Sequence, residues 1–427
     1  MKKLVNLSHI LFSLFLLLSQ GVIAQESVSV RVVDNGVERV DTIDLPTSMT
    51  YPLDSLLADW KAKNYIELNQ DCSTSRDNPV FSDSVYIERL SRMPVVMEMP
   101  YNEVVRACID RYTGKLRNHV AFMLSACNFY MPIFEQALDA YDLPLELKYL
   151  PIIESALNPS AKSRAKAMGL WQFMLRTGKI YGLESNSYVD ERCDPIKSTW
   201  AAARYLKDLY NIYKDWNLVI AAYNCGPGNV NKAIRRAGGK TDYWAIYNYL
   251  PRETRGYVPA FIAANYVMTY YCKHNICPME TNIPAATDTV MVSKNLHFEQ
   301  IVDLCGIDME QLKSLNPQYK RNIIPGESKP QTLRLPIQQI SAFIDQQDTI
   351  YEHRKLELFK NRKVVPVSDG RGQAIKGNGE LTYHRIRNGE TLGSIARRYG
   401  VSVKQIQQWN GMTNTKISAG KRLKIYK

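Results

Sequence analysis

The sequence predicts a multidomain chain in which one all-α domain is followed by two small α+β modules. Segments with helical periodicity follow one another from Tyr101 to about Cys277, and strand signals are scarce there. In the C-terminal third, one pattern of residues occurs twice at an offset of 94 positions. A stretch rich in glycine and polar residues, 367–379, separates the two copies and indicates a flexible linker.

Length and composition support a folded chain of several domains. With 427 residues, of which 45% are hydrophobic and 22% charged, the chain can bury apolar cores, which excludes wholesale disorder. The formal net charge is +12, and +9 of it falls on residues 383–427, where ten Lys and Arg oppose Glu390 alone. Such a basic tail is typical of a protein that binds an anionic polymer, either nucleic acid or a wall polymer.

The first residues predict a secretory signal peptide. Two lysines precede the apolar run Leu11–Leu18, and Gly21–Ala24 places small or apolar residues before a cut after Ala24. The run is shorter than the roughly 20 residues that span a membrane. No cysteine precedes Cys72, so no lipid-attachment site adjoins the cut. We expect export to the periplasm or cell envelope as a soluble or wall-associated protein, without a lipid anchor or stable membrane insertion. Export argues against a nucleic-acid partner.

The repeat predicts that each copy runs strand, helix, glycine stop, capped helix, strand. The offset aligns the following pairs: Phe298 with Leu392, Gly306 with Gly400, Leu312 with Ile406, and Asn316 with Asn410. Glycine suits a helix C-terminus, and Ser402 with Gln405 forms a capping box in the second copy. The expected organisation is a signal peptide, an N-terminal region without an assigned role, the helical domain, a first module, a linker and a last module. Their bounds are 1–24, 25–99, 100–280, 285–338, 339–381 and 382–427.

The eight cysteines do not form a recognisable framework. Cys272 and Cys277 are close enough in sequence to pair locally. No Cys-x-x-Cys or His-x-x-x-His cluster supports a zinc site, so we expect no metal and no cofactor.

One carboxylate occupies an apolar face. The pattern predicts a helix over Leu143–Leu157, capped by Asp142, in which Glu154 falls in line with the leucines. A carboxyl group moved out of water resists ionisation, so its pKa should rise into the range of a general acid. There are two alternatives. Glu154 could form a buried ion pair, or the helix could end at Glu154 and leave its side chain exposed to solvent.

Four short motifs then follow one another along the helical region. They are Glu154-Ser155, Gly169-Leu170-Trp171-Gln172, Ala222-Tyr223-Asn224, and Glu253-Thr254-Arg255-x-Tyr257-Val258. In this order and spacing they resemble the lytic murein transglycosylases, whose helical fold is similar to goose-type lysozyme. The D-type branch, with trailing LysM modules, looks most similar. The resemblance covers about Tyr101 to Cys277 and both modules.

The resemblance implies a role for each matching residue. Glu154 matches the catalytic acid and base, and Tyr223 matches the hydroxyl donor that orients its carboxyl group, with Asn224 beside it. Ser163 and Gln172 match polar residues that contact sugar, and Met174 matches an apolar residue of the cleft wall. The alternatives are that Met174 and Trp171 belong to the core and that Ser163 only shapes a turn. Cys225 stands where a small Ala or Ser is usual, and we expect it to pack there.

The activity implied is non-hydrolytic cleavage of peptidoglycan between N-acetylmuramic acid and N-acetylglucosamine, which leaves 1,6-anhydromuramic ends. Ordinary glycosidases need two carboxylates, and Glu146, Glu184 and Glu191 all look solvated. A hydrolytic muramidase and a non-catalytic wall-binding scaffold are the alternatives. The module from Thr382 resembles LysM, with Gly389-Glu390-Thr391-Leu392 and Trp409-Asn410, and implies a glycan partner. The first copy lacks the former element and is a divergent LysM-like module. The oligomeric state does not follow from the sequence.

Overall fold

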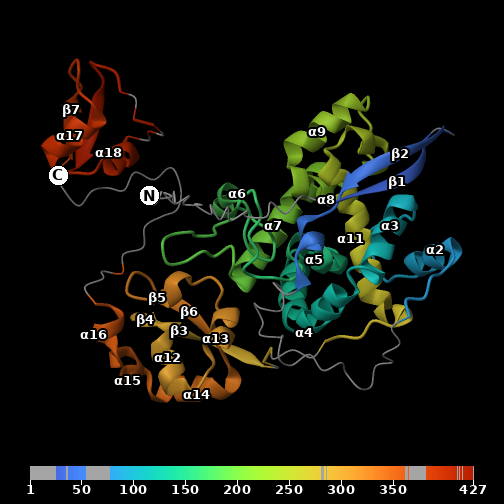
Figure 1. Cartoon of the computed structure of the whole chain (residues 1–427), viewed down its shortest axis with the longest axis horizontal. Helices are drawn as coiled ribbons and strands as arrows, with labels where there is room; N and C mark the ends of the chain where they lie inside the picture. The colour runs from blue at the N-terminus through green and yellow to red at the C-terminus, as the bar shows by residue number, and fades with distance from the viewer. Residues whose placement is uncertain are drawn as a thin grey trace, which may run out of the picture.

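A computed structural model describes residues 26–34, 37–53, 77–279, 283–284, 286–360, 364, 381–410, 412, 414–415 and 417–426. The predicted signal peptide and the predicted linker segment 367–379 lie outside these residues. These described residues form three separate apolar cores, one centred in the helical domain and one in each trailing module. Figure 1 shows the helical domain with its N-terminal hairpin in blue, the first module in orange and the last module in red.

The helical domain is built around α11, Arg252–Tyr270, whose residues from Gly256 to Met268 are all buried. It packs against α3, α5 and α8. The bounds of the other helices are α2 Asp83–Ser91, α3 Glu103–Thr113, α4 Arg117–Ala140, η3 Leu145–Tyr149, α5 Leu150–Ser155, α6 Leu175–Ile180, α7 Pro195–Tyr213, α8 Trp216–Cys225, α9 Pro227–Arg236, α10 Tyr243–Ile246, η4 Tyr247–Tyr249 and η5 Tyr271–His274. In the part of the chain that the structure describes, no helix is both long and apolar enough to cross a membrane.

The helix predicted over Leu143–Leu157 is wrong in detail, because it is divided into η3 and α5. Asp142 has a positive φ of 50° and does not cap η3, which begins after Pro144. Pro151 lacks the N–H that a continuous helix would need there, and this explains the break. α5 then ends at Ser155, because Ala156 adopts the left-handed conformation.

The N-terminal region, which had no assigned role, folds onto the helical domain. Strands β1 (Ser27–Asp34) and β2 (Val37–Asp44) form an antiparallel hairpin that pairs Ser27 with Asp44. β2 packs on α11, β1 packs on α3, and the short helix η1 (Thr47–Thr50) packs on α5. Ile43, Leu45 and Met49 are buried in the core of the domain.

Both modules have the predicted order of elements. In the first, β3 (Thr287–Val292) pairs antiparallel with β6 (Gln331–Pro336), β4 (Asn295–His297) pairs with β5 (Ile323–Pro325), and α12 (Phe298–Cys305), α13 (Met309–Leu315) and η6 (Lys320–Asn322) lie between. In the last, β7 (Leu381–Arg385) pairs with β8 (Arg422–Tyr426) around α17 (Leu392–Tyr399) and α18 (Val403–Trp409).

The repeat extends to hydrogen bonds. Gly306 and Gly400 end α12 and α17 in the left-handed conformation. The side chain of Asn316 donates to the carbonyl groups of Leu312 and Arg334 at 2.9 and 2.8 Å and accepts from the Arg334 amide at 2.8 Å. Asn410 makes the same three contacts, with Ile406 and Lys424. The predicted capping box of Ser402 and Gln405 is also present.

The linker predicted from residue 339 begins too early. Helices α14 (Ile337–Asp345), α15 (Gln347–Glu352) and α16 (Lys355–Leu358) continue the first module, and Phe343 and Ile350 are fully buried in its core. The buried amide of Gln300 donates to three carbonyl groups at the end of α15, those of Ile350, Tyr351 and His353. These contacts were not visible in the sequence because Gln300 and α15 are about fifty residues apart.

The predicted local pairing of Cys272 with Cys277 is also wrong. Cys277 is disulfide-bonded, whereas Cys272 carries a free, exposed thiol. The two residues flank the end of η5, where Asn275 adopts the left-handed conformation.

We predict that Asn316→Ala lowers the local free energy of unfolding of the first module by about 1–3 kcal/mol, because the partly buried Arg334 amide and carbonyl lose their partner. Hydrogen exchange of the β6 amides in the full chain measures this change. Gln338→Ala on the exposed face of α14 is the control. Equal protection of β6 in the two variants would contradict the prediction.

Candidate active site

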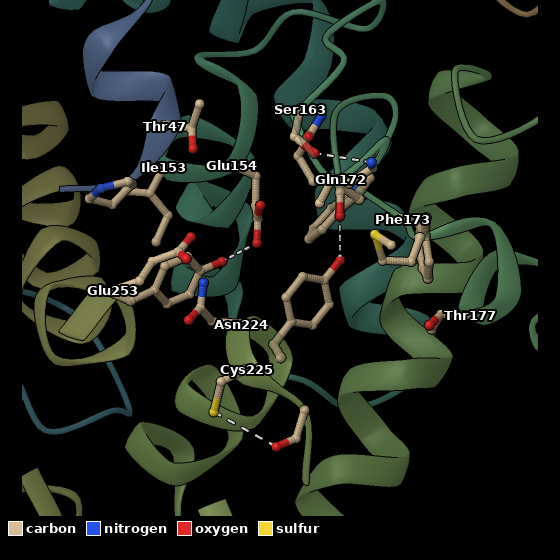
Figure 2. A pocket seen from close by; sticks show the side chains of 18 of the residues that line it. Thr47, Ile153, Glu154, Ser163, Gln172, Phe173, Thr177, Asn224, Cys225 and Glu253 are labelled. Atoms are coloured by element: carbon tan, nitrogen blue, oxygen red, sulfur yellow. Dashed lines mark hydrogen bonds between the residues drawn. The ribbon is translucent and has the colours of Figure 1, made fainter. Parts of the chain in front are cut away.

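A cleft of about 400 Å³ opens on the helical domain and collects side chains from segments far apart in the sequence. Five groups of residues line it: Pro46 and Thr47 before and in η1, Ile153 and Glu154 of α5, the 163–174 loop with Thr177, Tyr205 with Tyr223 to Gly226, and Glu253 with Tyr257. Figure 2 shows Glu154, Asn224 and Glu253 around one cleft, although they belong to three different helices.

Glu154 lies in the last turn of α5, and its neighbour Ser155 fixes that turn. The Ser155 hydroxyl is fully buried and lies 3.0 Å from the Pro151 carbonyl and 2.9 Å from the Leu170 carbonyl. The Glu-Ser motif therefore joins the end of α5 to the loop that carries Gln172. This is the reason for a small hydroxyl residue directly after the glutamate.

Burial raises the pKa of the Glu154 carboxyl group to about 8. Removal of water is the largest cause, the negative charge of Glu253 adds to it, and a hydrogen bond from Tyr257 opposes it. A carboxyl group with this pKa is mostly protonated at pH 7 and can donate a proton to a leaving group. The predicted rise is therefore confirmed.

The hydroxyl that contacts Glu154 is that of Tyr257, not that of Tyr223. Tyr257 donates to Oε1 of Glu154, whereas Tyr223 donates to the Trp171 carbonyl at 2.8 Å. The orienting role predicted for Tyr223 is therefore wrong. Tyr257 is one helical turn after Glu253 on α11, and both line the cleft. Tyr257 belongs to the fourth motif of the sequence, and this motif is the feature that could have identified it as a site residue.

The polar residues predicted to contact sugar lie in the cleft and also hold their own loop. Gln172 donates from its amide nitrogen to the carbonyl groups of Ala161 and Gly169, at 3.2 and 2.8 Å. The hydroxyl of Ser163 accepts from the Ala167 amide at 3.0 Å. Ser163 therefore shapes a turn and lines the cleft at the same time.

The apolar residues of the loop differ in exposure. Met174 is 45% exposed in the cleft, so it does not belong to the core. Trp171 is fully buried and donates from its ring nitrogen to the Thr199 hydroxyl at 2.9 Å, as expected of a core residue.

Asn224 and Cys225 end α8 beside the start of α11. The side-chain oxygen of Asn224 accepts from the Thr254 hydroxyl at 2.7 Å, which joins the two helices. Cys225 is half-buried, and burial raises the pKa of its thiol. The thiol therefore stays protonated near neutral pH.

Of the three acidic residues expected to be solvated, Glu184 is exposed, and the other two are not. Glu146 and Glu191 are buried rather than solvated: Glu146 accepts from the amides of Val96 and Met97, and Glu191 pairs with Lys197 at 2.6 Å. The second acid of the cleft is Glu253, which is exposed. Among the described residues, no group of three or more His, Cys, Asp and Glu could hold a metal ion.

The N-terminal segment contributes a wall that the sequence did not reveal. Pro46 and Thr47 line the cleft, and the buried hydroxyl of Ser48 donates to the Ile153 carbonyl at 2.5 Å, next to Glu154. Burial and then the charge of Glu154 raise the pKa of Tyr51. Nothing in residues 46–51 marks them as part of a site until they are folded onto α5.

Comparison with known proteins places this geometry in a family. The transglycosylase SLT domain matches residues 131–246, the LysM-like domain of the lytic transglycosylase MltD matches 286–352, and the LysM domain matches 384–425. Over 335 residues the chain is 31% identical to the membrane-bound lytic murein transglycosylase D of Escherichia coli (strain K12), across 77% of this chain and 70% of that protein. The chain belongs to this family of lytic murein transglycosylases.

More distant relatives match the helical domain. The membrane-bound lytic murein transglycosylase F of Maricaulis maris is 34% identical over 129 residues, which cover 27% of this chain and 26% of that protein. The crystal structure of the 70 kDa soluble lytic transglycosylase of Escherichia coli aligns with a TM-score of 0.30 and 28% identity, over 33% of this chain and 24% of that one. The family, the helical lysozyme-like domain and the lytic transglycosylase activity that the motifs predicted are confirmed.

We predict that Tyr257→Phe shifts the basic limb of the pH profile of kcat/KM to higher pH. The Tyr257 hydroxyl lowers the pKa of Glu154, so its removal lets that pKa rise above about 8. The acid form then persists to higher pH. The loss of one orienting hydrogen bond should also lower kcat roughly tenfold.

Tyr249→Phe, which removes an exposed hydroxyl on η4, is the matched control and should leave the profile unchanged. A basic limb that stays in place in folded Tyr257→Phe would show that Tyr257 does not set the pKa of Glu154.

Proposed function

We propose that Glu154 alone carries the proton transfers by which this lytic transglycosylase cleaves the bond between N-acetylmuramic acid and N-acetylglucosamine. The observation that supports this is a carboxyl group in a glycan-sized cleft with a pKa of about 8 and one orienting donor, Tyr257. A group that is protonated before the reaction and can accept a proton after it serves both halves of the reaction.

In the first half, Glu154 gives its proton to the oxygen that links the two sugars, and the bond from that oxygen to the muramoyl C1 breaks. In the second half, the muramoyl C6 hydroxyl attacks C1, and its proton passes to the Glu154 carboxylate. The product carries a 1,6-anhydro ring, and no water is consumed. Tyr257 continues to donate to the carboxylate between the two steps and stabilises its charge.

The loop 163–174 and the end of α8 are proposed to hold the glycan. Gln172 uses its amide nitrogen within the loop, which leaves its amide oxygen to accept from a sugar. Exposed Met174 offers an apolar surface for the face of a sugar ring, and Ser163 and Asn224 add polar atoms to the cleft.

Hydrolysis is the second candidate, because Glu253 also lines the cleft. A second carboxylate could activate a water molecule, as in inverting glycosidases. Two features favour transglycosylation. Glu253 is exposed, whereas burial raises the pKa of Glu154 to about 8. The chain also belongs to a family named for transglycosylation.

We also propose export and binding to the wall. Residues 1–24 are removed on export, and the last module holds the enzyme on peptidoglycan through its LysM fold and its basic surface. The relative from Escherichia coli is described as membrane-bound. Fractionation of cells and N-terminal sequencing of the mature protein test where this chain resides and where it is cut.

We predict that Glu154→Gln abolishes cleavage, because the amide can neither donate to the glycosidic oxygen nor accept from the C6 hydroxyl. Each of the two transfers contributes about 10²–10⁴-fold. The wild type should release 1,6-anhydromuramic ends from purified sacculi, measured by mass spectrometry. Glu253→Gln, the control, should give the same anhydro products. Reducing ends from the wild type, or full activity of folded Glu154→Gln, would contradict the mechanism.

The same variant has a pH-dependent effect on stability. The unfolded chain loses the Glu154 proton near its ordinary pKa, whereas the folded chain holds it to about pH 8. The wild type therefore loses stability as the pH rises through this window. Glu154→Gln lacks this loss, so its advantage in Tm over the wild type should grow from pH 5 to pH 8. An advantage that stays constant over this range would contradict the raised pKa.

We predict that removal of residues 382–427 weakens retention on insoluble peptidoglycan and leaves the cleavage of short soluble glycans nearly unchanged. The last module has its own apolar core, and a binding module of this kind mainly raises the local concentration of substrate. Co-sedimentation with sacculi measures retention. Equal sedimentation of the truncated and full-length proteins would contradict a wall-binding role for this module.

A further inference from the structure

The core of the first module includes two side chains from the helical domain. Tyr188 and Val189 follow α6 in the sequence, yet they are buried with Phe298, Tyr319 and Leu333 of the module. Val189 is 2% exposed. Figure 1 shows the module, in orange, beside the green segment that follows α6. A module that takes part of its core from its neighbour is docked on it.

Backbone pairing reinforces this contact. Val189 and Tyr319 form an antiparallel bridge, the Asp190 amide donates to the Gln318 carbonyl at 2.8 Å, and the Lys320 amide donates to the Tyr188 carbonyl at 2.7 Å. Such hydrogen bonds fix the register between the two chain segments. The pairing therefore determines the position of residues 188–190 relative to the module.

Charged side chains close the edge of this interface. The ammonium group of Lys320 donates to the Asn186 carbonyl at 2.7 Å and lies 3.8 Å from the Asp190 carboxylate. Lys329 pairs with Glu184 at 3.0 Å. Both lysines belong to the module and both acidic residues to the helical domain, so the charges are complementary across the interface.

Asp190 connects the interface to Arg192. The guanidinium group of Arg192 forms a fork on the Asp190 carboxylate, with distances of 2.9 and 2.8 Å, and both side chains are buried. A buried pair of this kind has little freedom to move, because separation leaves two charges without water or a partner. The position of Asp190 against the module therefore sets the position of Arg192.

Arg192 in turn holds the loop that lines the cleft. Its remaining nitrogen donates to the carbonyl groups of Lys166 and Phe173, both at 3.1 Å. The backbone also packs closely: a Cβ on Gly169 would lie 1.9 Å from the Arg192 carbonyl oxygen. In the sequence, Lys166 and Phe173 lie on either side of Gln172, and most of the residues by which this loop lines the cleft lie between them or at them.

We propose that the first module is a fixed part of the catalytic unit, which positions the substrate-binding loop 163–174 through Asp190 and Arg192. It acts on the affinity for glycan rather than as a tethered wall-binding module. The assignment of the loop to glycan binding rests on the proposed function. Arg192 is a positioning residue, because it contacts the loop and not the proposed reaction centre at Glu154.

Lys320→Glu in the full-length protein tests the docking from the module side. It places a negative charge beside Asp190 and should weaken the interface. We expect faster hydrogen exchange at the Asp190 amide and at the amides of Lys166, Gly169 and Phe173. We also expect a roughly tenfold rise in KM for soluble glycan strands, with kcat within about twofold of the wild type and an unchanged basic limb of the pH profile.

Lys313→Glu is the matched control, because it makes the same change of charge on α13, where Lys313 pairs with Glu310 of its own helix. It should behave like the wild type. Faster exchange at the Asp190 amide of Lys320→Glu, with unchanged loop exchange and unchanged KM, would overturn the proposal.

Arg192→Lys tests the connection from Asp190 through Arg192 to the loop directly. It is the deciding variant if Lys320→Glu does not speed up exchange at the Asp190 amide. Lysine keeps the charge beside Asp190, but one nitrogen cannot reproduce the fork and also reach both carbonyl groups. Faster loop exchange and a higher KM are expected. Wild-type values for both would overturn the proposal. Because exchange is measured without turnover, a failure of the catalytic mechanism would leave this result intact and is recognised separately.

Discussion

The active site depends on the removal of water from the Glu154 carboxyl group. The segments that surround this group exclude water from it. Desolvation raises the pKa to about 8, while the Tyr257 hydroxyl keeps one oxygen oriented. Desolvation raises the pKa of Glu154 and the hydrogen bond from Tyr257 lowers it. Together they give an acid that is protonated near neutral pH and held in one orientation. A carboxyl group in open water would satisfy neither requirement, because it would ionise near its ordinary pKa and rotate freely.

Dry surroundings require several segments, because α5 is only six residues long and cannot enclose a side chain in its last turn. Each enclosing segment is attached by its own hydrogen bonds. Ser155 joins α5 to the loop that follows, Ser48 joins the N-terminal segment to Ile153, and Asn224 joins α8 to α11 through Thr254. The N-terminal hairpin thus belongs to the catalytic unit. Gly256, where a Cβ would lie 2.6 Å from the Asp44 carbonyl oxygen, lets β2 approach the helix that carries Tyr257.

The two trailing modules share an internal design and differ in their surroundings. Asn316 and Asn410 make equivalent hydrogen bonds, so the repeat preserves what holds each module together. The first module additionally buries Tyr188 and Val189 of the helical domain, whereas the core of the last module consists of its own residues. One repeated fold can therefore serve as a structural support in one position and as a binding module in another, because these two uses depend on different surfaces.

The sequence by itself determined the helical domain, the repeat with its glycine stops and capping box, and Glu154 as an acid on an apolar face. These features are local: they depend on spacing, capping and backbone conformation within a few residues. Only the tertiary structure decided that Tyr257 rather than Tyr223 contacts Glu154, that Pro46 and Thr47 line the cleft, and that α14 to α16 belong to the first module. Tyr257 and Tyr223 are both tyrosines in helical motifs, and which hydroxyl reaches the carboxyl group depends on how α8 and α11 cross. Ser48 and Ile153 are more than a hundred residues apart in the sequence. A contact of this kind leaves no periodic signal in the sequence, because it depends on how distant segments pack and not on local spacing.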